Sequence, residues 1–289
     1  MKEFQGTGVA LVTPFDARLE VDYKGLKDLL DFTSKDVDYF VVQGTTGEST
    51  TTSAKEKINI LEFVLNNNAN QLPIVYGIGG NNTNRVIETI KQTKLDRVSA
   101  ILSVSPYYNK PTQEGIYQHY VKIADSSPVP VILYNVPGRT MSNITAETTI
   151  RLSDHQNIIG IKEASGDLEQ CKRIMAAKPA DFMLISGDDM LTTAMMSMGA
   201  VGVISVLANG FPQIFKRITH TALDNNFEAS KQATKSLNGI NTLMYTESNP
   251  VGIKEVLFQK EVCGNEVRLP LLAASQQLKI EIMQKLGLL

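Results

Sequence analysis

The sequence predicts a (β/α)₈ barrel, or TIM barrel, with a C-terminal all-helical appendix. Short apolar runs rich in Val and Ile alternate with segments of helical periodicity over roughly the first 220 residues. Most of these runs lack polar–apolar alternation, which is typical of parallel strands that are buried on both faces. Beyond Asn209 and Gly210 only helical patterns remain. This organisation favours a barrel over the runner-up class, a doubly wound open sheet.

Eight apolar runs are the predicted strands: Val9–Thr13, Tyr39–Gln43, Ile74–Ile78, Ala100–Val104, Val129–Tyr134, Ile158–Lys162, Met183–Ser186 and Val201–Val206. In a barrel of this kind the carboxyl ends of the strands meet at one mouth, where the active site is built. Polar residues at the ends of these runs are therefore the first candidates for function.

Capping patterns predict where several helices begin. Ser53 and Glu56 match a capping box, so a helix is expected to start between them. Thr83 and Asp167 each stand before apolar residues at helical spacing. The pair Asp188-Asp189 is predicted as the N-cap and first turn of a further helix.

Helical patterns at the end of the chain follow Pro212 and then cover about 227–243, the region of Ile253 and Leu257, and about 271–286. No linker rich in Pro, Gly or Ser separates these helices from the strands. We therefore expect a catalytic barrel of residues 1–222 and a helical domain of residues 223–289 that packs on it.

Composition argues against several classes of protein. The formal net charge is −2 and the two signs are interspersed, which disfavours nucleic acid or an anionic membrane as the main partner. Cys171 and Cys263 lie far apart and form neither a disulfide framework nor a metal motif. The three histidines are also scattered, so we expect no metal site. Residues 1–15 lack the features of a signal peptide, so we expect a cytoplasmic protein.

Lys162 is the most informative residue of the sequence, because it ends a buried strand. Strand alternation puts Ile158, Gly160 and Lys162 on one face. A lysine in such a strand must be paired, neutralised or in reach of solvent. It could be an inert amine that extends to the barrel mouth. It could instead be a desolvated amine that attacks a carbonyl and forms a Schiff base, with Gly160 leaving room for a small substrate.

Other strand ends carry candidate groups, each with a plainer alternative. Tyr134 could shuttle protons, or its hydroxyl could be solvated at the mouth. The turn Gly44–Glu48 could offer hydroxyl and N–H donors to a carboxylate, or it could be a turn with a helix cap. Arg139 could hold a second carboxylate, or it could be a solvated charge. Tyr107-Tyr108 could belong to the site or to a subunit interface.

Five motifs occur in order along the chain: Gly44–Glu48, Pro106–Asn109, Tyr134–Thr140, Gly160–Glu163 and Ser186–Asp189. With these motifs the chain resembles the dihydrodipicolinate synthase family, a branch of the Schiff-base aldolase superfamily that includes N-acetylneuraminate lyase. The resemblance runs from Gly8 to the C-terminus and includes the helical appendix. Arg139 marks the synthase branch, whose aldehyde substrate carries an amino-acid carboxylate.

The resemblance implies an activity. Pyruvate would condense with L-aspartate-4-semialdehyde through a lysine Schiff base to give 4-hydroxy-tetrahydrodipicolinate, the first committed step toward diaminopimelate and lysine. Lys162 would form the Schiff base. Tyr134, Thr45 and Tyr108 would form a proton relay, with Tyr108 coming from a neighbouring subunit. We expect no cofactor, because the protonated imine is itself an electron sink.

The resemblance also implies binding residues and partners. Thr46 would hold the pyruvate carboxylate and Arg139 that of the aldehyde, while Gly187 and the backbone of Ile204 would line the pocket. Family members are commonly homotetramers built from two tight dimers, so we expect self-association. Met141 departs from the family pattern, since many relatives have glycine there, and it stands beside Arg139.

Three alternative functions use some of the same groups. A retro-aldolase for sialic acid or a 2-keto-3-deoxy sugar acid would need the same lysine and tyrosine, and Arg139 argues against it. A catalytically silent pyruvate-binding member would not retain the lysine and all three relay hydroxyls together. A pyridoxal phosphate barrel enzyme would need a phosphate cradle after the later strands, where Asp188-Asp189 bring negative charge instead.

The resemblance finally implies weak or absent inhibition by L-lysine. Lysine-regulated relatives bind the inhibitor near the Tyr107-Tyr108 turn, where Asn81 and Ser49 match. They use an acidic side chain where Arg85 stands, and often histidines where Ala54 and Lys57 stand. Two positive groups in these places would repel the side-chain ammonium of lysine.

Overall fold

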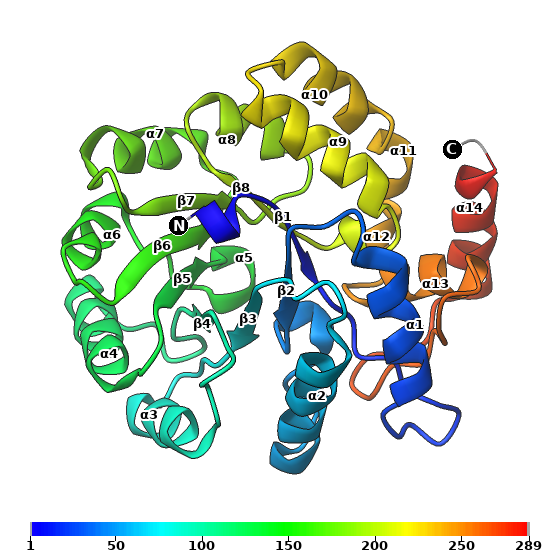
Figure 1. The fold of residues 1–289 in the computed structure, drawn as a ribbon, viewed down its shortest axis with the longest axis horizontal. Coiled ribbons are helices and arrows are strands. Elements are labelled where there is room, and N and C mark those ends of the chain that lie inside the picture. Colours follow the sequence, from blue (N-terminus) through cyan, green and yellow to red (C-terminus); the bar gives the residue numbers. More distant parts are fainter. Residues whose placement is uncertain (1, 288–289) are drawn as a thin grey trace.

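Eight parallel strands close into a barrel in the computed structural model, which describes residues 2–287 (Figure 1). Residues 1, 288 and 289, at the ends of the two predicted domains, lie outside the described residues. Each strand pairs with the next one along the chain, and β8 pairs with β1. The predicted barrel is confirmed, and the alternative open sheet is wrong, because closure leaves neither β1 nor β8 as an edge.

The strands are β1 (Gly6–Ala10), β2 (Tyr39–Val42), β3 (Ile74–Gly77), β4 (Ala100–Val104), β5 (Val131–Asn135), β6 (Ile158–Glu163), β7 (Met183–Ser186) and β8 (Gly202–Ser205). The first differs most from its prediction, Val9–Thr13. It starts earlier because Thr7, although polar, is buried with its hydroxyl bonded to the Phe215 carbonyl at 3.1 Å and to Thr219 at 2.9 Å. Apolar patterning alone does not detect such a residue.

The helices that cover the barrel are α1 (Tyr23–Thr33), α2 (Ala54–Asn67), α3 (Thr83–Gln92), α4 (Gln113–Ser126), α6 (Ala146–Ser153), α7 (Leu168–Ala177), α8 (Thr192–Ser197) and α9 (Pro212–Leu223). The predicted capping box of Ser53 and Glu56 opens α2, and Asp167 caps α7. Asn82 caps α3, which begins at Thr83. Short helical turns complete the chain at its start and at strand ends: η1 (Lys2–Phe4), η2 (Thr45–Gly47), α5 (Pro137–Thr140) and η3 (Leu207–Asn209).

Two apolar clusters hold the barrel together. The smaller one fills its interior with strand side chains such as Val41, Val75 and Ile132. The larger one lies between the strands and the helices, and it continues into the C-terminal segment through residues such as Met244 and Val256. Burial of this apolar surface is the main favourable term in folding.

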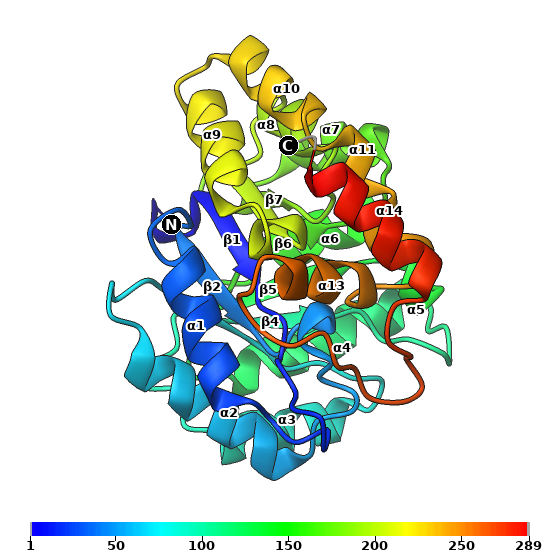
Figure 2. The same cartoon turned by 90° about the vertical axis from the view of Figure 1, so that its right-hand side faces the viewer.

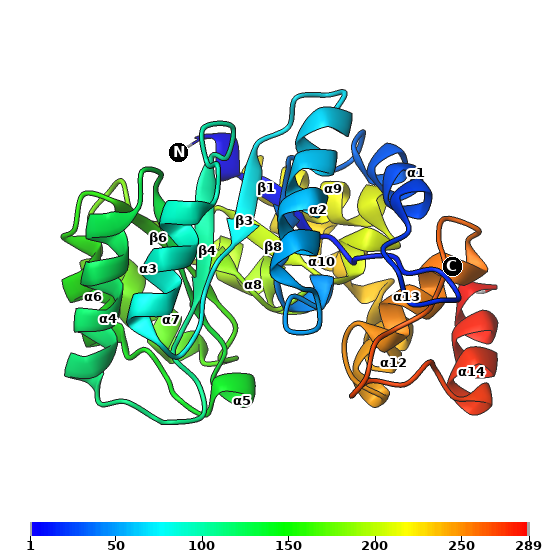
Figure 3. The ribbon, with the colours of Figure 1, turned by 90° about the horizontal axis from the view of Figure 1, so that it is seen from below.

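The C-terminal segment contains α10 (Phe227–Lys235), α11 (Asn238–Asn241), α12 (Leu243–Thr246), α13 (Val251–Gln259) and α14 (Gln276–Leu286). Figure 3 shows α12, α13 and α14 on the side of α1, with α4 and α6 on the opposite side, and in Figure 2 α13 and α14 face the viewer. The helix predicted over 227–243 is interrupted at residues 236–237 and again at Thr242. The last helix starts at Gln276 because Ser275 caps it.

No helix within residues 2–287 is both long enough and apolar enough to span a membrane.

Candidate active site

Lys162 and Tyr134 face each other across neighbouring strands at the mouth of the barrel. They are register partners in β6 and β5. Lys162 Nζ lies 4.4 Å from the centroid of the Tyr134 ring. The two residues are 6% and 7% exposed, so both are largely shielded from water. The two residues that the sequence singled out are therefore in contact.

Glycines next to Lys162 allow the close packing of its surroundings. A Cβ atom on Gly187 would lie 3.1 Å from Lys162 Cε and 2.6 Å from Ala164 Cβ, so a side chain there would displace the lysine. A Cβ atom on Gly160 would lie 2.7 Å from the Met183 carbonyl oxygen. The backbone of β7 therefore fills the space beside Gly160 that was expected to hold substrate.

Glu163 is the buried neighbour of Lys162 on the opposite face of β6. Its carboxylate accepts hydrogen bonds from Asn135 Nδ2 at 2.9 Å, the Ser165 amide at 2.7 Å and Gln170 Nε2 at 2.8 Å. These neutral donors hold a buried anion without a cation. The network anchors the end of β6 to β5 and α7.

The predicted N-cap role of Asp188-Asp189 is wrong. α8 begins only at Thr192, and Asp188 Oδ1 instead accepts from the amides of the turn before it, Met190 and Leu191. Asp189 is buried, and its Oδ2 accepts from the Val206 and Leu207 amides at 3.2 and 2.9 Å. Burial raises the pKa of Asp189 to about 6, and the charge of Lys162 opposes that rise.

Ile204 is fully buried in β8 and belongs to the interior cluster of the barrel. Its strand runs directly into the turn that Asp189 holds. The Ile204 backbone therefore stands at the level of the mouth, while its side chain packs in the interior.

The turn Gly44–Glu48 is shaped by residues from the C-terminal segment. Thr46 is buried, and its hydroxyl accepts a hydrogen bond of 3.1 Å from Asn249 Nδ2. Glu48 is also buried, and Lys254 Nζ donates to its Oε1 at 2.5 Å. Sequence reasoning missed Asn249 and Lys254. The detectable sign was a charged Lys254 inside the otherwise apolar start of α13.

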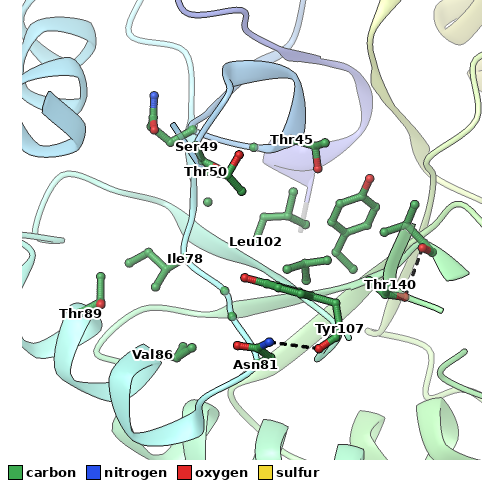
Figure 4. A pocket seen from close by; sticks show the side chains of 18 of the residues that line it. Thr45, Ser49, Thr50, Ile78, Asn81, Val86, Thr89, Leu102, Tyr107 and Thr140 are labelled. Atoms are coloured by element: carbon green, nitrogen blue, oxygen red, sulfur yellow. Dashed lines mark hydrogen bonds between the residues drawn. The ribbon is translucent and has the colours of Figure 1, made fainter. Parts of the chain in front are cut away.

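A cavity of about 620 Å³ opens at the mouth (Figure 4). Of the predicted site residues, Thr45, Tyr134 and Arg139 line it. Lys162, Thr46, Gly187, Ile204 and Tyr108 do not line it. The cavity therefore brings together two members of the predicted proton relay, Thr45 and Tyr134, and Arg139, the arginine predicted to bind a carboxylate.

Tyr108 stands apart from these groups. Its side chain is 87% exposed, whereas its neighbour Tyr107 lines the cavity and accepts a hydrogen bond of 3.1 Å from Asn81 Nδ2 through its carbonyl. Within this chain Tyr108 is thus not brought to Tyr134. Its predicted contribution from a neighbouring subunit stays a prediction.

Arg139 lies on α5 at the rim, exposed and facing the cavity. Met141 ends α5 with φ at 58°, in the left-handed region. That backbone conformation favours glycine, because a Cβ atom is crowded there. The methionine, 64% exposed, carries this strain beside the arginine.

No group of three or more His, Cys, Asp or Glu side chains suited to a metal ion occurs within residues 2–287. The three histidines lie apart and are bonded to Thr83, Asp125 and Asp38. The polar groups of the mouth are therefore an amine, hydroxyls, a guanidinium and backbone amides.

The fold and the mouth define a barrel enzyme whose site lies at the carboxyl ends of the strands. The family model of the dihydrodipicolinate synthetase family matches residues 3–288, and the chain belongs to this family. It is 50% identical over 285 residues to the 4-hydroxy-tetrahydrodipicolinate synthase of Cytophaga hutchinsonii, covering 98% of this chain and 96% of the relative.

Solved structures agree with this assignment. The chloride-inhibited dihydrodipicolinate synthase of Acinetobacter baumannii, complexed with pyruvate, matches with a TM-score of 0.95 and 36% identity over 98% of both chains. The DHDPS of Cyanidioschyzon merolae with lysine bound matches with a TM-score of 0.94 and 36% identity over 99% of both chains.

Proposed function

We propose that the protein condenses pyruvate with L-aspartate-4-semialdehyde to give 4-hydroxy-tetrahydrodipicolinate, as a lyase of the Schiff-base aldolase type. The reaction is the first committed step toward diaminopimelate and lysine. The observation that carries the proposal is the buried amine of Lys162 against Tyr134, in a chain half identical to a synthase of that name. None of the relatives described above is named as a sugar-acid aldolase or as a silent binding protein.

Lys162 acts as the nucleophile. Its neutral amine adds to the C2 carbonyl of pyruvate. Uptake of one proton from the hydroxyl relay and loss of water then leave a protonated imine on Nζ. The imine then withdraws electrons from the methyl group, which loses a proton and becomes the enamine carbon that attacks the aldehyde.

Hydroxyl groups move the protons of these steps. We assign the relay to Tyr134, Thr45 and Tyr108, the last from a neighbouring subunit. The Tyr134 ring lies beside Lys162 Nζ, with 4.4 Å between Nζ and the ring centroid, and this proximity supports a role for Tyr134 in proton transfer. The exposed side chain of Tyr108 is free to enter another subunit, which supports self-association as a homotetramer.

Binding of the two substrates is assigned to separate groups. Thr46 and nearby amides hold the pyruvate carboxylate, and Gly187 and the Ile204 backbone line its place beside Lys162. Arg139 at the rim binds the carboxylate of the semialdehyde through a paired hydrogen bond. Arg139 lines the same cavity as Tyr134, and this position supports its assignment to the second substrate.

The proposal also assigns separate roles to the two domains of the chain. Residues 1–222 form the catalytic barrel, and residues 223–289 form a helical domain whose Asn249 and Lys254 fix the carboxylate-binding turn. We place the enzyme in the cytoplasm.

Reductive trapping tests the function. Pyruvate with borohydride should convert Lys162 to a stable secondary amine, located by peptide mass spectrometry. Lys254 is an internal control, because it is also buried but is bonded to Glu48, and it should stay unmodified. Lys162→Arg should abolish trapping. An unmodified Lys162 in the wild type would disprove the mechanism.

A further inference from the structure

Glu163 is bonded to more of the site than the end of its own strand. It follows Lys162 in β6, and its register partner in β5 is Asn135, which follows Tyr134. Asn135 Nδ2 donates to both oxygens of the Glu163 carboxylate, at 3.1 and 2.9 Å. This bonded pair therefore fixes the two strand ends on which Lys162 and Tyr134 stand.

A third segment of the mouth is bonded to the same pair. Asn135 Nδ2 also donates to Asn143 Oδ1 at 2.7 Å, and Asn135 Oδ1 accepts from the Ile144 amide at 2.9 Å. These partners follow α5, and Arg139 of α5 lies four positions before Asn143. The segment that carries the arginine is thus tied to the ends of β5 and β6.

Gln170 of α7 completes this network. Its Nε2 donates to Glu163 Oε2 at 2.8 Å and to the Ile144 carbonyl at 3.2 Å. Its Oε1 accepts from Asn143 Nδ2 at 2.9 Å. Glu163, Asn135 and Gln170 are all at most 2% exposed. A buried polar network whose members satisfy one another is rigid and favours one arrangement of its parts.

We propose that Glu163 is a positioning residue for the condensation, whose carboxylate fixes the places of Tyr134 and Arg139 beside the reacting lysine. This inference rests on the roles assigned to those residues in the proposed function. Proton transfer and attack on the aldehyde depend on such placement, since a displacement of about 1 Å can slow a reaction about a hundredfold. The extent of imine formation at saturating pyruvate is an equilibrium quantity and depends on it much less.

Glu163→Gln tests the proposal, because it keeps the size of the side chain and removes its charge. A glutamine has one acceptor oxygen and one NH₂ group in place of two acceptor oxygens. The Ser165 amide donates to Oε1 and Gln170 Nε2 donates to Oε2, so the new NH₂ group faces a donor in either orientation. One buried donor then lacks an acceptor, which disturbs the network.

Glu255 of α13 provides a matched control. It is also buried, and its carboxylate accepts from two neutral side-chain amides, Gln259 Nε2 at 2.9 Å and Asn265 Nδ2 at 2.7 Å. Neither partner belongs to the proposed site. Glu255→Gln therefore removes a buried charge of the same kind without a change at the mouth. Urea unfolding of both variants compares their losses of stability.

The main measurement is exchange of the pyruvate methyl protons in deuterated water, followed by proton NMR without the semialdehyde. Exchange requires the imine and a base for the methyl proton. In Glu163→Gln we expect exchange at saturating pyruvate and kcat for the condensation each to fall about tenfold or more. Borohydride trapping at Lys162 should still go to completion. Glu255→Gln should leave exchange and kcat within about twofold of the wild type.

Unchanged exchange and kcat in Glu163→Gln would overturn the proposal, and so would an equal fall in Glu255→Gln. Loss of trapping in Glu163→Gln would also overturn it, since the carboxylate would then act on the amine itself. If Glu163→Gln does not fold, Gln170→Leu removes one donor to the carboxylate and should lower exchange about threefold or more; no change there would refute the proposal. Absence of trapping in the wild type would instead disprove the proposed function.

Discussion

Lys254 Nζ donates to Glu48 Oε1 at 2.5 Å, and both side chains are buried. Lys254 also donates to the Glu266 carbonyl at 2.6 Å, and Glu48 Oε2 accepts from the Arg268 amide at 3.1 Å. The two charges thus satisfy each other and have further partners, as a buried pair requires. The pair joins the turn of residues 44–48 to a segment more than 200 positions away.

Removing one member of this pair should strongly destabilise the protein. Lys254→Met leaves the Glu48 carboxylate buried without its cation, which we expect to lower the free energy of unfolding by about 3–5 kcal/mol. Urea unfolding of the variant and the wild type measures the loss. The double variant Glu48→Gln/Lys254→Met should lose less than the two single changes together. Lys24→Met, at an exposed pair with Asp28, is the control and should cost less than about 1 kcal/mol; an equal cost at both sites would contradict the prediction.

Arg139→Ala should impair the reaction with the semialdehyde much more than Schiff-base formation with pyruvate. Loss of a charge-assisted hydrogen bond to the semialdehyde carboxylate costs about 1.5–3 kcal/mol, so kcat/KM for that substrate should fall about tenfold to a hundredfold. Formation of the pyruvate Schiff base, followed by borohydride trapping, should change little. If both steps fall equally, Arg139 is structural.

Asn249→Ala should weaken pyruvate binding, because Asn249 is bonded to Thr46. The variant removes the donor that orients the Thr46 hydroxyl, and a neutral hydrogen bond contributes about 0.5–1.5 kcal/mol. We therefore expect KM for pyruvate to rise about threefold to tenfold, with a smaller change in KM for the semialdehyde. Steady-state kinetics with each substrate varied will measure both constants. A rise confined to the semialdehyde would contradict the assignment of Thr46.

His119 should make the protein less stable in acid. Burial lowers the pKa of its imidazole to about 4, below the ordinary value near 6.5. Between these pH values the unfolded chain binds the extra proton, so this contribution to stability is lost as pH falls. The loss approaches about 3 kcal/mol at pH 4. Unfolding free energies at pH 7 and pH 4 should differ less in His119→Gln than in the wild type. His155→Gln, in the segment between α6 and β6 where it is bonded to Asp125, should keep the wild-type difference.

L-Lysine should inhibit the enzyme weakly or not at all, unlike a family member that is known with lysine bound. Lys57 and Arg85 line the cavity, and the side-chain ammonium of lysine would meet both. Two unit charges ~4 Å apart repel by ~4 kcal/mol at an effective dielectric of ~20. Millimolar L-lysine should therefore reduce the initial rate by less than half at saturating pyruvate. Stronger inhibition would refute this prediction, and Arg85→Glu would then test the charge directly.

Much of the fold could be predicted from the sequence because local patterns agree with it. The continuous apolar runs of β2, β4 and β7 match their strands at both ends or within one residue. β1 was misplaced because Thr7 is buried through hydrogen bonds to α9, and no local pattern encodes a partner that distant. The long helix expected after Asn226 is also divided into short pieces, at residues 236–237 and at Thr242.

The site was predictable only in part. Lys162 and Tyr134 were found because each ends an apolar run, and these two consecutive runs form the neighbouring strands β5 and β6. Asn249 and Lys254 were missed because their roles depend on contacts with Thr46 and Glu48, far away in sequence. The pair Asp188-Asp189 was mistaken for the N-cap and first turn of a helix, because a helix start and a buried acceptor of backbone amides look alike in sequence.

The late position of Lys254 and Arg268 has a consequence for synthesis of the protein. A ribosome delivers residues 44–48 long before the residues that bind them, and it delivers β1 long before β8 closes the sheet beside it. The nascent chain therefore leaves the exit tunnel with an unpaired strand edge and with Glu48 still hydrated. Such an edge invites pairing with other chains. The catalytic mouth acquires its final form only when translation is nearly complete.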